Sequence, residues 1–275
     1  QPELLAHHYT EAGLLAQAIS YWQKAGQRAS QRSAYVEAVS HFTKGLELLS
    51  ALPDSPERAQ HELTLQITLG ASLMAIKGYA APEVGKAYAR ARELCQQVGE
   101  TPQLFSVVGG LATFHIIRGQ LRTARELVEQ LLRLAQRLQN PTLLQAAHYG
   151  MGEVLFDLGE LPRSRTHLEQ AITLYDPQKR RFRALHDPGV ACLSIAALTL
   201  EWLGYPDQAL KRIRESFSLA QELSHPFSLS FALYCAASFY RFRREVKTTQ
   251  EQAEELIALA HEQGFTLREA SGVTL

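Results

Sequence analysis

Three similar stretches, "RGQLRTA" (118–124), "LGELPRS" (158–164) and "LGYPDQA" (203–209), decide the fold of this chain. In each one a glycine is followed five positions later by a small residue: Gly119 by Ala124, Gly159 by Ser164, and Gly204 by Ala209. Glycine readily ends a helix in the left-handed conformation, and a small side chain on the next helix lets the two backbones approach closely. Each stretch therefore predicts the turn of a helical hairpin.

These turns recur with a period of 40 to 45 residues. A looser copy, "GYAAPEVGKA" (78–87), precedes them, and another, Arg244 with Thr249, follows them without the glycine. Between the turns, apolar residues recur at helical spacing, and no comparable period-two run occurs. Because one hairpin cannot bury its own apolar faces, neighbouring hairpins must stack. We predict an all-α chain of about 14 helices, a right-handed superhelix of stacked antiparallel hairpins, which is an α-solenoid.

We expect these repeats to form a single domain over 1–275. Its parts are irregular N-terminal repeats over 1–52, where Ala18 and Ala38 are only 20 positions apart, longer repeats of 40–45 residues over 53–265, and the start of a truncated helix over 266–275. Because the chain starts without Met and ends within that last helix, we expect it to be a fragment of a longer protein.

The composition excludes several classes of protein. Lys plus Arg and Asp plus Glu number 28 each among 275 residues, so no net charge attracts the chain to nucleic acid or to an anionic membrane. The longest uncharged apolar stretch, 189–200, is shorter than the roughly 20 residues that span a bilayer. Cys95, Cys192 and Cys235 lie far apart, which argues against a disulfide framework. We expect a cytoplasmic protein without a cofactor.

The stretch "YTEAGLLAQAISYWQKA" (9–25) resembles the tetratricopeptide repeat (TPR). Tyr9, Gly13, Ala18 and Trp22 stand at the offsets of that repeat, and the later copies keep its glycine and small-residue positions. The repeats here are longer than the usual 34 residues, which predicts longer helices. The resemblance implies a non-enzymatic domain for protein–protein interaction.

A narrower resemblance covers nearly the whole chain. The segments 4–49 and "HDPGVACLSIAALTLEWLGYPDQAL" (186–210) are similar to the helical C-terminal region of bacterial multidomain signalling ATPases, which often carry adenylate or guanylate cyclase or kinase domains. The resemblance implies a sensor or scaffold that regulates a nucleotide-binding switch elsewhere in the parent protein. This chain lacks the phosphate-binding loop itself, because Ala80 and Ala87 stand where such a loop around Gly85 and Lys86 needs a glycine and a hydroxyl residue.

The stretch "RALHDPGVACL" (183–193) contains the one cluster that resembles a catalytic site. Cys192 would be the nucleophile of a hydrolase, with His186 as its base and Asp187 orienting the base. The alternative explains more residues: Asp187 caps a helix, Pro188 is its first residue, and Cys192 lies in the apolar run that follows. We therefore expect no catalytic residue, and since no metal-binding motif occurs, no metal.

The binding surface is predicted from the repeat rather than from a motif. In stacked hairpins the first helices line the concave groove, and alignment with the repeat gives its lining residues as Thr113, Tyr149, Glu153, Ser194, Glu201, Tyr234, Ser238 and Arg241. Aromatic faces and a few charges suit an extended peptide, a partner domain or a small effector.

Two basic clusters, "QKRRFR" (178–183) and "RFRR" (241–244), lie at loops or helix ends. We expect Arg180, Arg181 and Arg183 to contact a protein partner, or another domain of the same chain, rather than nucleic acid or a membrane. The main alternative function is the effector-sensing helical domain of a transcription activator of the maltose-regulator type. A hydrolase using Cys192 and His186 is the alternative from another class.

Overall fold

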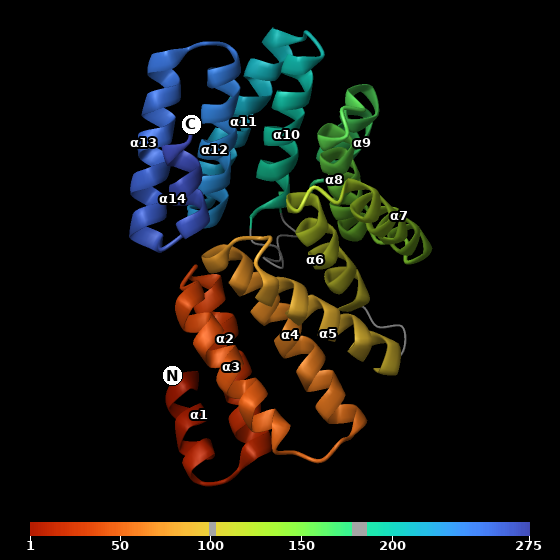
Figure 1. Ribbon diagram of the computed structural model, residues 1–275, viewed down its shortest axis with the longest axis vertical. Helices are drawn as coiled ribbons and strands as arrows, with labels where there is room; N and C mark the ends of the chain where they lie inside the picture. The colour runs from red at the N-terminus through yellow and green to blue at the C-terminus, as the bar shows by residue number, and fades with distance from the viewer. Residues whose placement is uncertain (99–102, 178–185) are drawn as a thin grey trace. The chain divides into compact units, whose positions relative to one another are not determined.

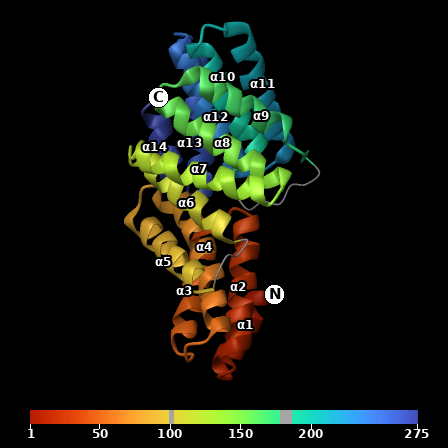
Figure 2. The same cartoon turned by 90° about the vertical axis from the view of Figure 1, so that its right-hand side faces the viewer.

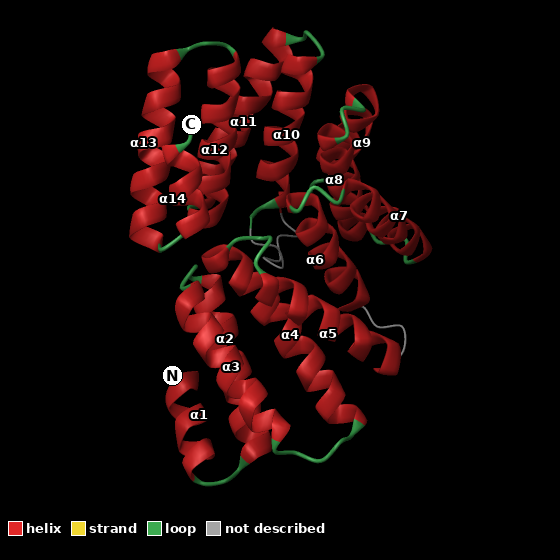
Figure 3. Cartoon of the chain, viewed as in Figure 1, coloured by secondary structure: helices red, strands yellow, loops and turns green. Residues whose placement is uncertain are grey.

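The computed structural model describes residues 1–98, 103–177 and 186–275. These residues form 14 α-helices and no strand, which confirms the predicted all-α class (Figure 3). The helices are α1 (Pro2–Glu11), α2 (Leu15–Gln31), α3 (Tyr35–Ser50), α4 (Pro56–Lys77), α5 (Pro82–Val98), α6 (Gln103–Ile117), α7 (Leu121–Arg137), α8 (Pro141–Asp157), α9 (Leu161–Thr173), α10 (Pro188–Trp202), α11 (Pro206–Leu223), α12 (Pro226–Phe242), α13 (Val246–Gln263) and α14 (Thr266–Val273). Among them, none combines the length and the apolar character of a membrane-spanning helix.

The chain divides into two compact units, Gln1–Ile117 and Arg118–Leu275. The first unit contains α1 to α6 and the second α7 to α14, and in each unit consecutive helices pack as antiparallel neighbours (Figures 1 and 2). The single domain expected over 1–275 stays a prediction.

Left-handed residues end many of these helices, and in three runs of the chain they recur every 20 residues. The residues with positive φ include Gly13 and Ser33 in the first unit, and Gly119, Gln139, Gly159, Gly204, Ser224, Arg244 and Gly264 in the second. After several of these residues the next N–H donates to a carbonyl five positions back, as Glu160 does to Leu155 at 2.9 Å. This is the Schellman bond, which closes a helix at a left-handed residue.

The 20 residues between the left-handed Gly13 and Ser33 account for the short distance between Ala18 and Ala38, which made the N-terminal repeats look irregular in the sequence. Ala18 and Ala38 each follow a left-handed residue by five positions, and both are fully buried. Helix α2 therefore serves as the second helix of one hairpin and as the first helix of the next. Its Trp22 is buried, and the indole Nε1–H donates to Thr10 Oγ1 at 3.1 Å, while Tyr9 stacks on Tyr21.

Small residues at the hairpin contacts are required by the close approach of the helices. Ala124, Ser164 and Ala209 have no exposed surface. A Cβ atom added to Gly152 of α8 would lie 2.5 Å from Leu168 Cγ of α9, so the larger side chain of one helix fills the space that the glycine leaves. These contacts confirm the predicted hairpin turns.

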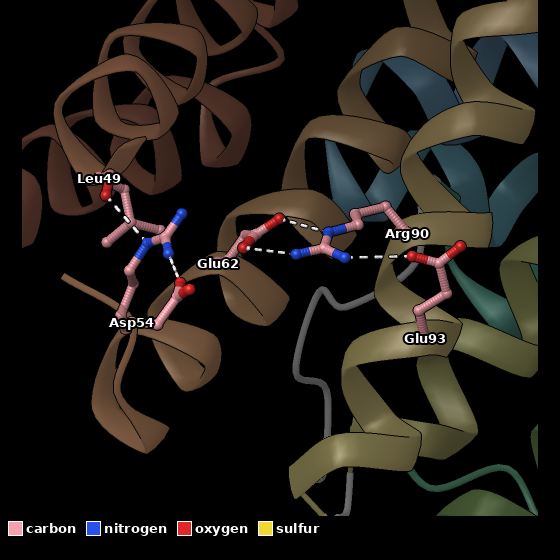
Figure 4. Close-up of polar contacts among 6 residues, drawn as sticks. Leu49, Asp54, Glu62, Arg90 and Glu93 are labelled. Carbon is pink, nitrogen blue, oxygen red and sulfur yellow. Dashed lines mark hydrogen bonds and ion pairs between the residues drawn. The ribbon is translucent and has the colours of Figure 1, made fainter. Parts of the chain in front are cut away.

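Polar side chains clamp α4 in the first unit (Figure 4). The Arg90 guanidinium of α5 donates to both carboxylate oxygens of Glu62, at 2.6 and 3.1 Å, and to Glu93 at 3.1 Å. At the start of α4, Arg58 Nε donates to the carbonyl of Leu49 at 3.1 Å, and the same guanidinium pairs with Asp54. The bidentate geometry of Arg90 and Glu62 fixes α5 against α4 more specifically than a single ion pair would.

Two substitutions test the left-handed turns in opposite directions. We expect Gly204→Ala to lower the free energy of unfolding by about 1 kcal/mol, because the added methyl group meets nothing within 4 Å and only backbone strain at φ +82° is introduced. Arg244→Gly should raise it by about 0.5 kcal/mol, since a non-glycine residue at φ 60° is relieved. Urea denaturation followed by circular dichroism measures both changes. If both variants changed the free energy of unfolding in the same direction, the assignment of left-handed turns at Gly204 and Arg244 would be contradicted.

Candidate binding site of the C-terminal unit

The first helices of successive hairpins lie side by side in the second unit. Helix α10 packs against both α8 and α12, and α12 packs against α14. Six side chains from this row of helices form one cluster, which we call the inner cluster: Tyr149 and Glu153 from α8, His186 just before α10, Phe231 and Tyr234 from α12, and Arg268 from α14.

Aromatic contacts connect α8 to α12 through the histidine. The Tyr149 ring meets His186 edge-on at 6.1 Å, and the tyrosine Oη lies 3.5 Å from His186 Nε2. On its other side His186 stacks on Phe231, because the two ring centroids are 4.5 Å apart and the ring planes are only 13° from parallel. The His186 imidazole therefore lies between the rings of Tyr149 and Phe231 and contacts both.

Arg268 is a nearly buried cation, with 6% of its surface exposed. Its Cζ lies 5.6, 5.1 and 5.3 Å from the ring centroids of Phe227, Phe231 and Tyr234. Three aromatic faces around one guanidinium form a cation–π cage, which offsets part of the cost of removing the charge from water. The cage also fixes α14 to α12.

The charge of Arg268 influences the ionisable groups around it. Glu153 is half-buried, and burial together with the nearby Asp157 raises the pKa of its carboxyl to about 7, although the hydrogen bond with Tyr149 and the charge of Arg268 act in the other direction. Burial, with the charges of Arg268 and His225, lowers the pKa of His186 to about 3. At neutral pH the cluster thus contains a neutral imidazole, a cation, and a carboxyl whose ionised form is disfavoured by burial.

The predicted helix cap at Asp187 is confirmed. The Asp187 carboxylate accepts from the N–H groups of Gly189 and Val190 at 2.8 and 3.1 Å, and Pro188 is the first residue of α10. Tyr175 Oη–H donates to the second carboxylate oxygen at 3.1 Å. This buried cap holds the start of α10, and with it His186, in place.

The burial of Cys192 does not favour a hydrolase at this position. Cys192 is fully buried inside α10, and burial raises the pKa of its thiol. His186 accepts a proton only at low pH, because its pKa is about 3. Burial therefore disfavours both the thiolate of Cys192 and the protonated form of His186, which is the opposite of what a nucleophile and its base require.

The structure places the predicted groove residues in different environments. Tyr149, Glu153 and Tyr234 belong to the inner cluster. Ser194 does not face a groove, since it is fully buried and its Oγ lies 2.7 Å from Ser216 Oγ of α11. Ser238 is also buried, because a small side chain on a first helix fits between packed helices.

The remaining predicted residues lie elsewhere in the described chain. Glu201 pairs with Arg243 at 3.4 Å, near the end of α10. Arg241 is exposed at the end of α12. Thr113 belongs to α6 of the first unit, where its hydroxyl donates to the Gly109 carbonyl, so it is not grouped with the others. Arg180, Arg181 and Arg183 lie outside the described residues.

Sequence reasoning missed His186, Phe231 and Arg268 as members of the cluster. The sequence did contain a signal for Arg268. It stands three positions after the N-cap residue of α14, and the equivalent positions of α8, α10 and α12 are Leu143, Val190 and Ser228. A charged residue at a position that is otherwise apolar or small predicts a specific partner.

No protein-family model matches this chain. An uncharacterized protein of Rhizobium meliloti (strain 1021) is 22% identical over 260 residues, which are 91% of this chain and 25% of that protein. The chain thus spans about a quarter of the relative that it matches.

Solved structures share the helical fold at low identity. NprR in complex with its cognate peptide NprX superposes with a TM-score of 0.69 at 15% identity, over 90% of this chain and 71% of that one. A Rap protein complexed with Competence and Sporulation Factor gives 0.65 at 11% identity, over 92% and 68%. The kinesin light chain TPR-like repeats of Podospora anserina give 0.55 at 16%, over 75% and 96%. These similarities show that the chain has a TPR-like fold.

The raised pKa of Glu153 predicts a pH-dependent effect of its removal. Between the ordinary carboxyl pKa and about 7, the folded state holds a proton that the unfolded state has lost, so this group stabilises the fold less as the pH rises through that window. We expect Glu153→Gln to raise the melting temperature relative to wild type more at pH 8 than at pH 5, as measured by calorimetry. Glu255→Gln, at an exposed position of α13, is the matched control. An equal effect of Glu153→Gln at both pH values would contradict the pKa assignment.

Proposed function

We propose that this chain is a non-enzymatic sensor or interaction module that binds a peptide, or a short segment of a partner protein, at the inner cluster. The observation that carries the proposal is the cluster itself. It combines aromatic faces from α8 and α12 with one cation and one carboxyl in a row of neighbouring helices. Aromatic faces supply contact area, and the charges orient a ligand with polar ends.

Other proteins with this fold support a peptide as the ligand. NprR was solved with its cognate peptide NprX, and a Rap conjugation gene regulator of the plasmid pLS20 was solved with the Phr* peptide. The second superposes with a TM-score of 0.64 at 12% identity, over 96% of this chain and 75% of that one. Because these proteins share only the fold with this chain, the identity of the peptide is a separate question.

We further propose that the module regulates a larger signalling ATPase, linked to an adenylate or guanylate cyclase. The resemblance of residues 4–49 and 186–210 to such helical regions supports this, and so does the match to a quarter of a longer Rhizobium meliloti protein. A ligand at the inner cluster would act by binding one arrangement of the helical hairpins more tightly than another, since only a difference in affinity shifts a conformational equilibrium.

The full-length reading frame separates this proposal from the maltose-regulator alternative. We expect a phosphate-binding loop and a cyclase or kinase domain in the parent protein. A C-terminal helix-turn-helix would contradict the proposal and favour the transcription activator, because that element reads DNA in such proteins.

Peptide binding at the inner cluster is tested with a double variant. An array of short peptides is screened with the protein, and the tightest binder is measured by isothermal titration calorimetry. We expect Tyr149→Ala with Tyr234→Ala to weaken that binding by about tenfold or more, because central aromatic side chains supply most of the affinity of such sites. Tyr205→Ala, at an exposed tyrosine of the α10–α11 turn, is the control. An unchanged affinity of the double variant would place the ligand elsewhere.

A further inference from the structure

The second unit has an exposed aromatic row outside the inner cluster. Trp202 at the end of α10 is 55% exposed, and Phe242 at the end of α12 is 48% exposed. Their rings meet edge-to-face at 5.2 Å, and the half-buried Phe156 at the end of α8 lies 5.9 Å from Trp202 on α10. The α10–α11 and α12–α13 turns that follow lie at the same end of these helices (Figure 3). We call these three rings the aromatic edge.

The aromatic edge differs from the single apolar side chains that are common on protein surfaces, because its rings are in contact with one another. Trp202 and Phe242 each stand two residues before a left-handed turn, so the repeat geometry brings them side by side. Neighbouring exposed rings of this size are characteristic of protein interaction sites, because single exposed apolar residues are common but contiguous ones are not.

Two exposed arginines flank Phe242. Arg241 Cζ lies 5.7 Å from the Phe242 ring centroid, and Arg244 is the turn residue that follows. Within the described part of the chain neither forms an ion pair, whereas Arg243 between them pairs with both Glu201 and Glu245. The nearby carboxylates are thus occupied by Arg243, and the charge available to a partner beside Phe242 is positive.

Arg244 occupies a left-handed turn position that is glycine after α8 and α10. The turns after α8 and α10 have Gly159 and Gly204 there, with φ of 76° and 82°, and Arg244 has the same left-handed conformation at 60°. Left-handed backbone is unfavourable for arginine, so its presence contributes nothing to the stability of the turn. Arg244 is exposed, so its guanidinium is available to a partner and has no part in forming the turn.

We propose that the aromatic edge, with Arg241 and Arg244, is a docking surface for an acidic amphipathic segment of a partner protein. Aliphatic side chains of the segment pack on Trp202 and Phe242, and its Asp or Glu side chains pair with the two free guanidiniums. Charge complementarity selects this occupant. Single-stranded nucleic acid could also stack on the rings, but Glu201 and Glu245 lie at the same edge and the chain has no net positive charge.

The test uses three fluorescent probes of matched length. Two are synthetic peptides with the same leucines, one carrying glutamates and the other lysines, and the third is single-stranded oligothymidylate. Fluorescence anisotropy should detect binding of the glutamate peptide only. We expect Trp202→Ala to weaken it by about tenfold, and Arg241→Gln and Arg244→Gly each by about threefold, since the ring is an anchor and the arginines are rim charges.

Controls separate this surface from stability and from the inner cluster. Arg244→Gly restores the residue that the turn favours, so a loss of binding there cannot come from a loss of folding. Arg214→Gln, at an exposed arginine of α11, should leave the affinity unchanged, and so should the Tyr149→Ala, Tyr234→Ala double variant. The proposal is wrong if the glutamate peptide does not bind, if the lysine peptide or the oligothymidylate binds as tightly, or if Trp202→Ala and Arg244→Gly have no effect.

Discussion

The left-handed residue between consecutive helices is the constraint on which the rest of each unit depends. Once that residue has positive φ, the following N–H reaches back to a carbonyl five positions earlier, as Tyr205 does to Leu200 at 2.9 Å. The chain then reverses at a fixed geometry, and the residue five positions after the turn meets the preceding helix. Glycine, serine, glutamine and arginine all occupy this position, so the turn is set by packing and hydrogen bonding more than by glycine.

The same turn places the two surfaces of the second unit. Left-handed residues reverse the chain at the turns from α8 to α14 other than the α9–α10 connection, and α8, α10, α12 and α14 pack in a row. Side chains in the body of these helices form the inner cluster, where Glu153 feels the charge of Arg268 although the two are distant in the sequence. Side chains just before the turns form the aromatic edge around Trp202 and Phe242.

Electrostatics gives the two surfaces different characters. In the inner cluster the cation is nearly buried among Phe227, Phe231 and Tyr234, and the neighbouring carboxyl has a raised pKa because burial outweighs the attraction of the guanidinium. Groups held in this way are already desolvated and oriented, which favours selective binding. At the aromatic edge the guanidiniums are exposed, and such charges influence association rates more than affinity.

The sequence by itself determined the helical class, the hairpin turns at Gly119, Gly159 and Gly204, and the cap at Asp187, because each depends on residues a few positions apart. It also indicated Tyr149, Glu153 and Tyr234. Only the tertiary structure decided that Ser194 is buried against Ser216, that His186 stacks on Phe231, and that Arg268 joins the cluster. Local periodicity fixes which face of a helix is apolar, but the rotation and tilt of packed helices decide which polar side chains on that face meet.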